Sequence, residues 1–257
     1  MDHVTARGVS FPALGLGTWP MTGTDCREAV ATALELGYRH VDTAQLYGNE
    51  ADVGDALEES DVPRSEVFVV TKVRRENLAP EDVLTSVRQS VDRLGTHADL
   101  LLVHAPSETV PIPETIDAMN DLQDRGLVDH LGVSNFDADQ LETAIAASGA
   151  PIVTNQVAYH PYRDRSALRR ACRAHDVVLT AYSPLAEGAV VGDEALAAIG
   201  EPHGKSAAQV ALRWLVQQDG VAAIPKASTE AHLRENLAVF DFSLSPAAME
   251  RVASLAE

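Results

Sequence analysis

Short apolar runs alternate with longer amphipathic segments along nearly the whole chain, beginning at Leu14. Several of these runs are continuously apolar rather than alternating, which is typical of parallel strands covered by helices. Counted from Leu14, the pattern predicts eight strands interleaved with helices. The expected strands cover residues 14–19, 38–42, 67–71, 99–104, 128–133, 152–157, 177–182 and 221–225.

The segments between the runs carry helix start and stop signals. Pro80 suits the first turn of a helix, and Gly95 suits the residue just after a helix end. Asp25, Asp137 and Asp164 are expected N-caps. The expected helices cover residues 25–36, 50–59, 80–94, 113–125, 137–147, 164–174, 205–217, 229–237 and 246–255, with a short helix inside 185–204.

This repeated order favours one α/β fold. A hairpin over residues 3–12, with Gly8 at its turn, precedes the repeats, and no Pro/Ser/Gly-rich linker divides them. We therefore expect a single (β/α)8 TIM barrel domain over residues 1–257 rather than two domains. Gly15 and Gly17 do not form a Rossmann fingerprint, because the third glycine and the helix opening are missing.

Polar residues close the apolar runs. The carboxyl ends of the strands hold the active site of a barrel, so these side chains are expected to converge. Each has an ordinary structural explanation alone, but their coincidence at eight strand ends favours a functional site. One His, one Asp and no Cys make metal binding a weak alternative, and no metal is expected. The strand-end residues are Thr18, Trp19, Asp42, Lys72, His104, Ser134, Asn135, Gln156, Tyr182, Ser183 and Lys226.

The formal net charge of −18 is unusual for 257 residues. It argues against nucleic acid, whose phosphates require a basic surface, and against anionic membranes. The only lysines are Lys72, Lys205 and Lys226. An acidic, lysine-poor surface gives the hypothesis of adaptation to concentrated salt, where a screening length of about 3 Å at 1 M relieves self-repulsion.

Nothing in the sequence points to secretion or membrane insertion. No apolar run approaches the ~20 residues that span a bilayer, and Met1-Asp2-His3 does not begin a signal peptide. Cys26 and Cys172 lie in different expected helices without metal-ligand spacing, as expected of reduced thiols. We therefore expect a cytoplasmic protein. A monomer is the default expectation, because no aromatic-rich patch stands out.

Several motifs together resemble those of the aldo-keto reductase family, in particular its prokaryotic aldehyde and keto-sugar reductases, over nearly the whole chain. They are LGLGTW at 14–19, YRHVDTA at 38–44 with YGNE at 47–50, LGVSNF at 131–136, NQV at 155–157, YSPL at 182–185, and IPK at 224–226 with EN at 235–236. The resemblance implies a small-molecule carbonyl substrate and a nicotinamide cofactor bound across the barrel mouth. It also implies a catalytic tetrad of Asp42, Tyr47, Lys72 and His104.

Carbonyl reduction gives each member of that tetrad a chemical reason. Tyr47 would donate a proton to the oxygen, although an unperturbed phenol has a pKa of about 10. The Lys72 ammonium is expected to stabilise the phenolate and lower that pKa, and Asp42 is expected to hold Lys72 charged. His104, neutral at physiological pH, would donate a hydrogen bond that orients the carbonyl oxygen.

The resemblance also implies where the ligands lie. Tyr182 would offer a flat face to the nicotinamide ring, and amide and hydroxyl side chains would bind its carboxamide. The implied substrate-pocket residues are Trp19, Tyr47, His104 and Ala105. The implied cofactor-binding residues are Thr18, Trp19, Asp42, Ser134, Asn135, Gln156, Tyr182, Ser183, Leu185, Ile224, Lys226, Ser228, His232, Glu235 and Asn236.

Two positions depart from the family pattern. The family commonly has His-Trp-Pro where this chain has His104-Ala105-Pro106, which should widen or reshape the substrate pocket. Members that prefer a 2′-phosphate usually carry Arg where His232 stands, and a neutral His holds phosphate less well than a guanidinium. Lys226 and Ser228 still offer a cation and a hydroxyl. NADPH is therefore the expected cofactor, with NADH tolerated.

Two other functions stay open. One is a non-catalytic, nicotinamide-binding regulatory barrel, as in the channel-associated relatives of the family, although the complete tetrad weighs against it. The other is a barrel isomerase or aldolase that uses Lys72 to form a Schiff base, which requires an unpaired, neutral lysine. Asp42 would instead hold Lys72 charged. The natural carbonyl compound is not identified, because loops line the pocket.

Overall fold

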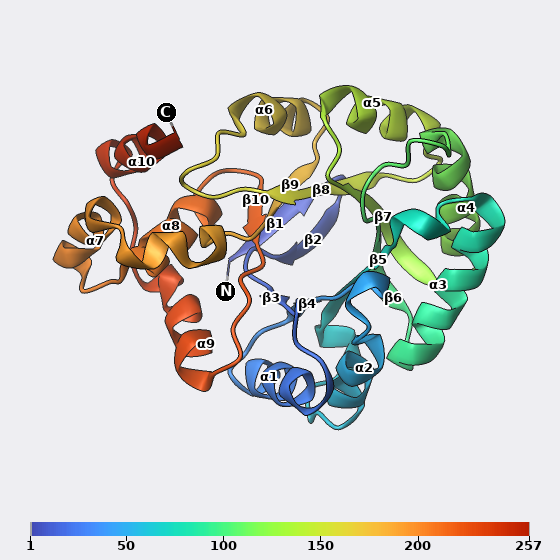
Figure 1. Cartoon of the computed structure of the whole chain (residues 1–257), viewed down its shortest axis with the longest axis horizontal. Coiled ribbons are helices and arrows are strands. Elements are labelled where there is room, and N and C mark those ends of the chain that lie inside the picture. The colour runs from blue at the N-terminus through green and yellow to red at the C-terminus, as the bar shows by residue number, and fades with distance from the viewer. Residues whose placement is uncertain (1, 257) are drawn as a thin grey trace.

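The computed structural model describes residues 2–256, so Met1 and Glu257, the ends of the expected domain, lie outside the described residues. Eight parallel strands form the centre of the molecule, each paired with the next along the chain (Figure 1). They are β3 (Leu16–Gly17), β4 (His40–Asp42), β5 (Phe68–Val73), β6 (Ala98–Val103), β7 (Val128–Ser134), β8 (Ile152–Ala158), β9 (Val178–Tyr182) and β10 (Val221–Ala223). The (β/α)8 fold expected from the sequence is confirmed.

The barrel closes through residues that flank its first and last strands. Leu14 forms a parallel bridge with Ala223, and the backbone N–H of Gly17 donates to the oxygen of Pro225 at 3.1 Å. A side chain at Gly17 would meet the backbone oxygen of Ile224 at 2.7 Å, so this close approach requires glycine. β3 is much shorter than the strand expected at 14–19, because the residues before it pair only as an isolated bridge.

Helices surround the strands, and α7 and α10 lie against α8 outside this ring (Figure 1). The helices are α1 (Gly23–Glu35), α2 (Glu50–Glu58), α3 (Pro80–Leu94), α4 (Ile112–Asp124), α5 (Ala138–Ala147), α6 (Ser166–Ala174), α7 (Glu194–Gly200), α8 (Ala207–Val216), α9 (Glu230–Leu237) and α10 (Pro246–Ala253). Most lie within two residues of their expected bounds.

The N-cap predictions had mixed outcomes. Asp137 caps α5 in a reciprocal capping box, as expected. Asp25 lies in the first turn of α1, whose N-cap is Thr22, so the expected cap is wrong. Asp164 is not a cap either, because α6 begins at Ser166. The backbone N–H of Ser166 donates to the carboxylate of Asp164 at 2.7 Å in a local turn. Acidic residues favour the first helical turn and tight turns as well as caps, so the sequence alone does not distinguish these three positions.

The hairpin expected at residues 3–12 covers the amino-terminal end of the barrel. It consists of the antiparallel strands β1 (His3–Ala6) and β2 (Val9–Pro12). Phe11 stacks on Phe68 with ring centroids 4.9 Å apart, and Nδ1–H of His40 donates to the oxygen of Pro12 at 3.1 Å. Both partners lie at strand beginnings, so the carboxyl ends of the strands remain uncovered by the hairpin.

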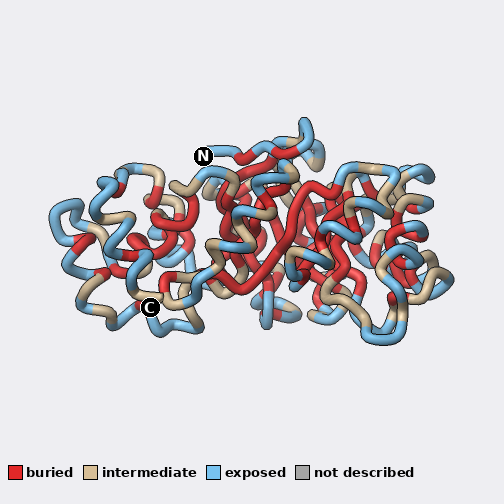
Figure 2. The backbone as a smooth tube through the Cα atoms, turned by 90° about the horizontal axis from the view of Figure 1, so that it is seen from above, coloured by how far each residue is buried: buried red, intermediate tan, exposed pale blue. Residues whose placement is uncertain are grey.

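Alternation along the strands separates the barrel interior from the layer under the helices. Val70, Leu100, Leu102 and Val153 form one buried cluster, while their strand neighbours, such as Leu101, belong to a larger cluster. Buried backbone accordingly runs through the centre of the molecule, with exposed residues around it (Figure 2). The next inward-facing positions along these strands lie at the carboxyl ends of the strands.

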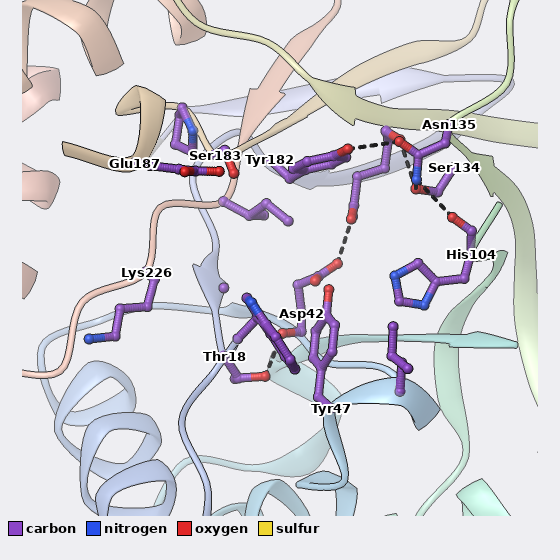
Figure 3. Close-up of a pocket in the computed structure, with 16 residues that line it drawn as sticks. Thr18, Asp42, Tyr47, His104, Ser134, Asn135, Tyr182, Ser183, Glu187 and Lys226 are labelled. Carbon is purple, nitrogen blue, oxygen red and sulfur yellow. Dashed lines mark hydrogen bonds between the residues drawn. The ribbon is translucent and has the colours of Figure 1, made fainter. Parts of the chain in front are cut away.

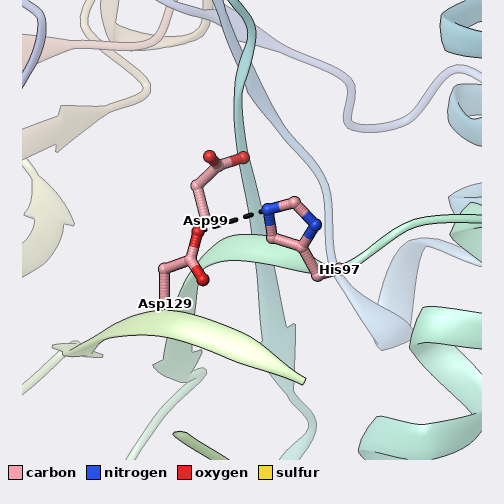
Figure 4. A group of neighbouring side chains, drawn as sticks. All are labelled: His97, Asp99 and Asp129. Carbon is pink, nitrogen blue, oxygen red and sulfur yellow. Dashed lines mark ion pairs between the residues drawn. The ribbon is translucent and has the colours of Figure 1, made fainter. Parts of the chain in front are cut away.

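A polar cluster joins the starts of the strands β5, β6 and β7 (Figure 4). Nε2 of His97 lies 3.2 Å from a carboxylate oxygen of Asp129. The carboxylate of Asp99 accepts hydrogen bonds from Arg64 at 2.6 Å and from the backbone N–H of Val69 at 2.8 Å. The side chains of His97, Asp99 and Asp129 lie near enough to one another to share a cation. Arg64 already supplies that positive charge, so we interpret the cluster as an ion-pair network at the amino-terminal end.

The surface carries most of the 38 acidic residues, and its ion pairs are weakly protected from solvent. In the pair of Arg173 and Asp219, for example, the two side chains are 75% and 77% exposed. Such exposed pairs contribute roughly 0–1 kcal/mol each. Within residues 2–256, no helix combines the length and the apolar character needed to cross a membrane.

We expect the melting temperature to rise by many degrees when potassium chloride is increased from tens of millimolar toward molar. Over that range the screening length falls from roughly 20 Å to roughly 3 Å, which relieves repulsion among the carboxylates. Thermal melts in a potassium chloride series measure the effect, and sucrose at equal osmolarity controls for general solute exclusion. A flat or falling midpoint would show that the acidic surface is no adaptation to salt.

Candidate active site

Strand alternation brings polar side chains together at the open end of the barrel. Lys72 follows Val70 of the interior cluster by two residues, and His104 follows Leu102 by two. Each therefore points inward, one layer beyond the apolar cluster. Other strand-end residues line a cavity at this end of the barrel, among them Asp42, Ser134, Gln156 and Tyr182.

Lys72 is fully buried at the centre of the site. Its ammonium pairs with one carboxylate oxygen of Asp42 and donates to the backbone oxygen of Thr43 at 2.9 Å. It also donates to Oη of Tyr47 at 3.1 Å. The second oxygen of Asp42 accepts from Nε2 of Gln156 at 2.6 Å (Figure 3). All three N–H groups of the ammonium thus have acceptors, and two of these acceptors, Asp42 and Tyr47, line the cavity.

The buried cation and the phenol both have raised pKa values. Burial alone would lower the pKa of Lys72, but Asp42 and Tyr47 more than offset this effect, and the net pKa is raised. Burial also raises the pKa of Tyr47, against the opposing influence of Lys72. The sequence-based expectation of a lowered phenol pKa is therefore wrong, because burial of the ring outweighs the cation. Tyr47 carries its proton and Lys72 its charge at neutral pH.

His104 faces the phenol across the site. Its ring centroid lies 5.7 Å from that of Tyr47, with the two planes at 82°. Burial and the charge of Lys72 lower the pKa of His104 to about 4, so the imidazole is neutral at physiological pH. Its Nδ1 is buried and has no hydrogen-bond partner among the described residues. Buried polar atoms without a partner are uncommon, and a catalytic role is one of the explanations for them.

Tyr47 lies on no strand but on η1 (Gln45–Tyr47), a single turn after β4. Oε1 of Gln45 accepts from the backbone N–H of Arg74 at 3.1 Å, and its Nε2 donates to the Ser90 hydroxyl at 3.2 Å. Both partners follow Lys72 in the chain, so Gln45 ties the turn that carries the phenol to the segment beyond the lysine. Sequence reasoning missed Gln45, because a polar loop residue has no distinguishing pattern.

A cavity of about 380 Å³ opens at this end of the barrel. Tyr47 and His104 lie on one side of it, and Lys226 and Glu187 lie on the other (Figure 3). The predicted residues that line it are Thr18, Trp19, Asp42, Tyr47, His104, Ser134, Asn135, Gln156, Tyr182, Ser183, Ile224 and Lys226. Sequence reasoning missed further lining residues. One of them, Leu46, could have been found, because it is an apolar residue in a polar loop. They are Gly17, Leu46, Pro184 and Glu187.

The remaining predicted residues lie outside the cavity wall. Nζ of Lys226 donates to the hydroxyl of Ser228 at 3.0 Å, so that hydroxyl lies beside the cation of the cavity. His232 is exposed on α9, while Asn236 on the same helix is buried. Ala105 does not line the cavity. The predicted residues outside the wall are the fully buried Lys72 and, further away, Ala105, Leu185, Ser228, His232, Glu235 and Asn236.

Non-glycine residues at the cavity mouth hold left-handed backbone conformations. Asn135 has a φ of +62°, Ser183 of +47° and Glu187 of +55°. Such conformations cost about 1–3 kcal/mol each and cluster at functional sites. Nδ2 of Asn135 donates to the backbone oxygen of His104 at 2.9 Å, and its Oδ1 accepts from the hydroxyl of Tyr182 at 2.8 Å. Asn135 therefore links the strand ends that carry the imidazole and the phenol of residue 182.

The donor set fits a flat ligand that bears an amide. Gln156 uses one Nε2 hydrogen on Asp42, which leaves its Oε1 and its other hydrogen for a ligand. The hydroxyl of Ser134 donates to the backbone oxygen of Gln156 at 2.8 Å and accepts from Nδ2 of Asn135 at 3.1 Å, which leaves it one acceptor position. The ring of Tyr182 lines the cavity beside them. An aromatic face next to the free amide groups of Gln156 suits a nicotinamide with its carboxamide.

Comparison with protein families and with curated proteins identifies similar reductases. The model of the Aldo/keto reductase family matches residues 13–257. An aldo-keto reductase of Mycolicibacterium smegmatis is 38% identical over 96% of this chain and 90% of its own length. Methylglyoxal reductase DkgB of Salmonella typhi is 38% identical over 96% of this chain and 94% of its own length.

Solved structures agree with those matches. The crystal structure of a protein provisionally named 2,5-diketo-D-gluconic acid reductase B has a TM-score of 0.98 and 48% identity, covering 100% of this chain and 92% of that one. The thermostable aldo-keto reductase Tm1743, in complex with the inhibitor epalrestat, has a TM-score of 0.93 and 37% identity, covering 99% of this chain and 100% of that one.

Proposed function

Because the chain belongs to the aldo/keto reductase family, we propose that it reduces an aldehyde or ketone to an alcohol with NADPH, using Tyr47 as the proton donor. Its reductase relatives support an oxidoreductase that acts on carbonyl compounds with a nicotinamide cofactor. One observation carries the assignment of residues: the buried Lys72 is held by Asp42 and presents one of its N–H groups to the phenol at the cavity.

Tyr47 gives its proton to the carbonyl oxygen as negative charge develops there. The phenol holds that proton at neutral pH, because burial keeps its pKa above the ordinary value. As the proton leaves, the ammonium of Lys72, 3.1 Å away, stabilises the forming phenolate. This interaction is stronger in the transition state than in the ground state, so it accelerates the step. Asp42 keeps Lys72 charged, and Gln156 fixes Asp42 in turn.

His104 orients the carbonyl group for this transfer. A neutral imidazole can donate one hydrogen bond to the carbonyl oxygen and so place it beside the phenol of Tyr47. Because the pKa of His104 is lowered to about 4, the ring holds no second proton at neutral pH. It therefore does not replace Tyr47 as the acid.

Bound in the cavity, a reduced nicotinamide supplies the hydride. Tyr182 would pack against its ring, and Asn135 and Gln156 would hold its carboxamide. Lys226, on the far side of the cavity, would meet the 2′-phosphate of NADPH together with Ser228. This division leaves the end of the cavity near Tyr47 for the carbonyl substrate.

The substitution His232→Arg is expected to tighten NADPH binding by roughly 1–2 kcal/mol and to leave NADH binding almost unchanged. A guanidinium forms charge-assisted hydrogen bonds with phosphate that a neutral imidazole does not. Arg234 does not already supply them, because it pairs with Glu230 at 2.7 Å. Fluorescence titration with each cofactor measures the two affinities.

His3→Arg is the matched control, since it adds the same charge at the opposite end of the barrel. It should change neither affinity. If His232→Arg tightens NADPH and NADH equally, position 232 does not lie beside the 2′-phosphate.

The relatives named methylglyoxal reductase and 2,5-diketo-D-gluconic acid reductase supply the first two compounds to assay, an uncharged dicarbonyl compound and a keto acid. A panel of aldehydes, keto-sugars and α-keto compounds assayed with NADPH tests the proposed reduction. The alternative of a Schiff base on Lys72 is tested on the same panel with borohydride and mass spectrometry. We expect no adduct on Lys72, because its ammonium is charged and satisfied by three acceptors.

A further inference from the structure

We propose that the substrate end of the cavity selects uncharged, apolar carbonyl compounds and discriminates against carbonyl compounds that carry a carboxylate. The inference rests on the proposed carbonyl reduction and narrows its substrate class. It comes from three features of the cavity wall: exposed apolar surface beside the phenol, an uncharged imidazole, and the position of the cation that lines the cavity.

Apolar surface is exposed where the substrate would lie. Trp19 is 55% exposed and Leu46 is 54% exposed, and both line the cavity. Among the described residues, Val191 is the remaining large hydrophobic side chain with comparable exposure. The indole of Trp19 lies beside the ring of Tyr47, with centroids 5.2 Å apart. An apolar substrate that covers these side chains removes their surface from water, which favours binding.

Positive charge is distant from that end of the cavity. Among the residues that line the cavity, Lys226 is the exposed cation, and it lies across the cavity from Tyr47 and His104 (Figure 3). Lys72 is close to the phenol but is completely buried, and its three N–H groups already have acceptors. A substrate carboxylate beside Tyr47 would therefore reach neither ammonium.

The groups around His104 do not supply a charge partner either. The imidazole itself is neutral at physiological pH, because its pKa is lowered to about 4. Arg74 and Arg75, which follow the end of β5, do not line the cavity, and Arg74 is paired with Glu76 at 2.9 Å. A carboxylate that enters this end loses part of its hydration and gains no cation, whereas an ester or an aromatic ring loses little.

A matched pair of substrates isolates the charge. 4-Carboxybenzaldehyde and its methyl ester share the ring and the aldehyde and differ at the carboxylate. With NADPH and the wild-type protein, we expect kcat/KM to be roughly 100-fold or more higher for the ester, mainly through KM. Similar values for the two compounds would overturn the proposal. If neither compound is reduced, although NADPH binds, the proposed function fails together with the selectivity.

Salt separates the local effect from the overall charge of −18. If long-range repulsion by the acidic surface caused the discrimination, it would fade toward equality in about 1 M potassium chloride, where screening acts over about 3 Å. We expect most of the ratio to persist, because desolvation inside the cavity is not screened. A ratio that collapses in salt would overturn the proposal.

A charge placed at position 46 should reverse part of the selectivity. Leu46→Arg adds a guanidinium to the wall beside Tyr47 and is expected to narrow the ester-to-acid ratio at least about 10-fold by lowering KM for the acid. Val191→Arg is the matched control, because Val191 is 68% exposed and lies outside the cavity wall. It should keep the wild-type ratio. Equal shifts in the two variants would show that net charge, rather than the cavity wall, sets the selectivity.

Discussion

Replacing Tyr47 by Phe is expected to lower the turnover of aldehyde reduction by at least about 10²–10⁴-fold, the usual contribution of a general acid. The change removes the hydroxyl proposed to donate the proton and leaves the ring between Trp19 and His104. Affinity for NADPH stays near that of the wild type, because the hydroxyl contributes little to cofactor contact. Steady-state kinetics and fluorescence titration measure the two quantities separately.

Tyr162→Phe is the matched control for this experiment. It removes a hydroxyl that donates to Asp193 at 2.7 Å outside the cavity wall, so turnover should be retained. A Tyr47→Phe variant that keeps most of its aldehyde reductase rate would remove Tyr47 from the mechanism. A variant that loses rate only because NADPH no longer binds would give the phenol a binding role instead.

Replacing Lys72 by Met lowers stability as well as turnover. The carboxylate of Asp42, which is 1% exposed, loses its cation, and breaking a buried ion pair in this way destabilises a protein by about 3–5 kcal/mol. We expect turnover to fall as well, because the phenolate that forms has lost the ammonium 3.1 Å away. Denaturant unfolding and steady-state kinetics measure the two effects.

The double variant Asp42→Asn, Lys72→Met separates stability from catalysis. Asn keeps an acceptor for Nε2 of Gln156 and removes the unpaired charge, so most of the lost stability should return. Turnover should stay low, since no cation faces Tyr47. Recovery of turnover in the double variant contradicts the role given to Lys72. Equal instability of the single and double variants would show that Asp42 is not the charge left unpaired.

The sequence is sufficient to place the residues at strand ends. Asp42, Lys72 and His104 each close an apolar strand, and strand alternation fixes the side to which each points. Lys72 shares its side with Val70, which is buried in the barrel interior, and therefore must face inward. Helix bounds were less certain at caps, where Asp25 follows the N-cap rather than occupying it.

The turns between strands and helices could not be predicted in the same way. Tyr47 lies in a turn without periodicity, so only its motif singled it out, and the contacts of Gln45 depend on residues from another strand–helix unit. The wrong expectation for the pKa of Tyr47 has the same origin. Burial of the phenol depends on Trp19 and His104, which approach from other strands.

The absorbance of NADPH after addition of a simple aldehyde tests the proposed carbonyl reduction most directly. We expect the absorbance to fall at a rate proportional to the concentration of the wild-type protein, with an amount of alcohol formed equal to the NADPH consumed. The Tyr47→Phe protein should bind NADPH and show little of this fall. If the wild-type protein binds NADPH but consumes none with any carbonyl compound of the panel, the reductase assignment is contradicted.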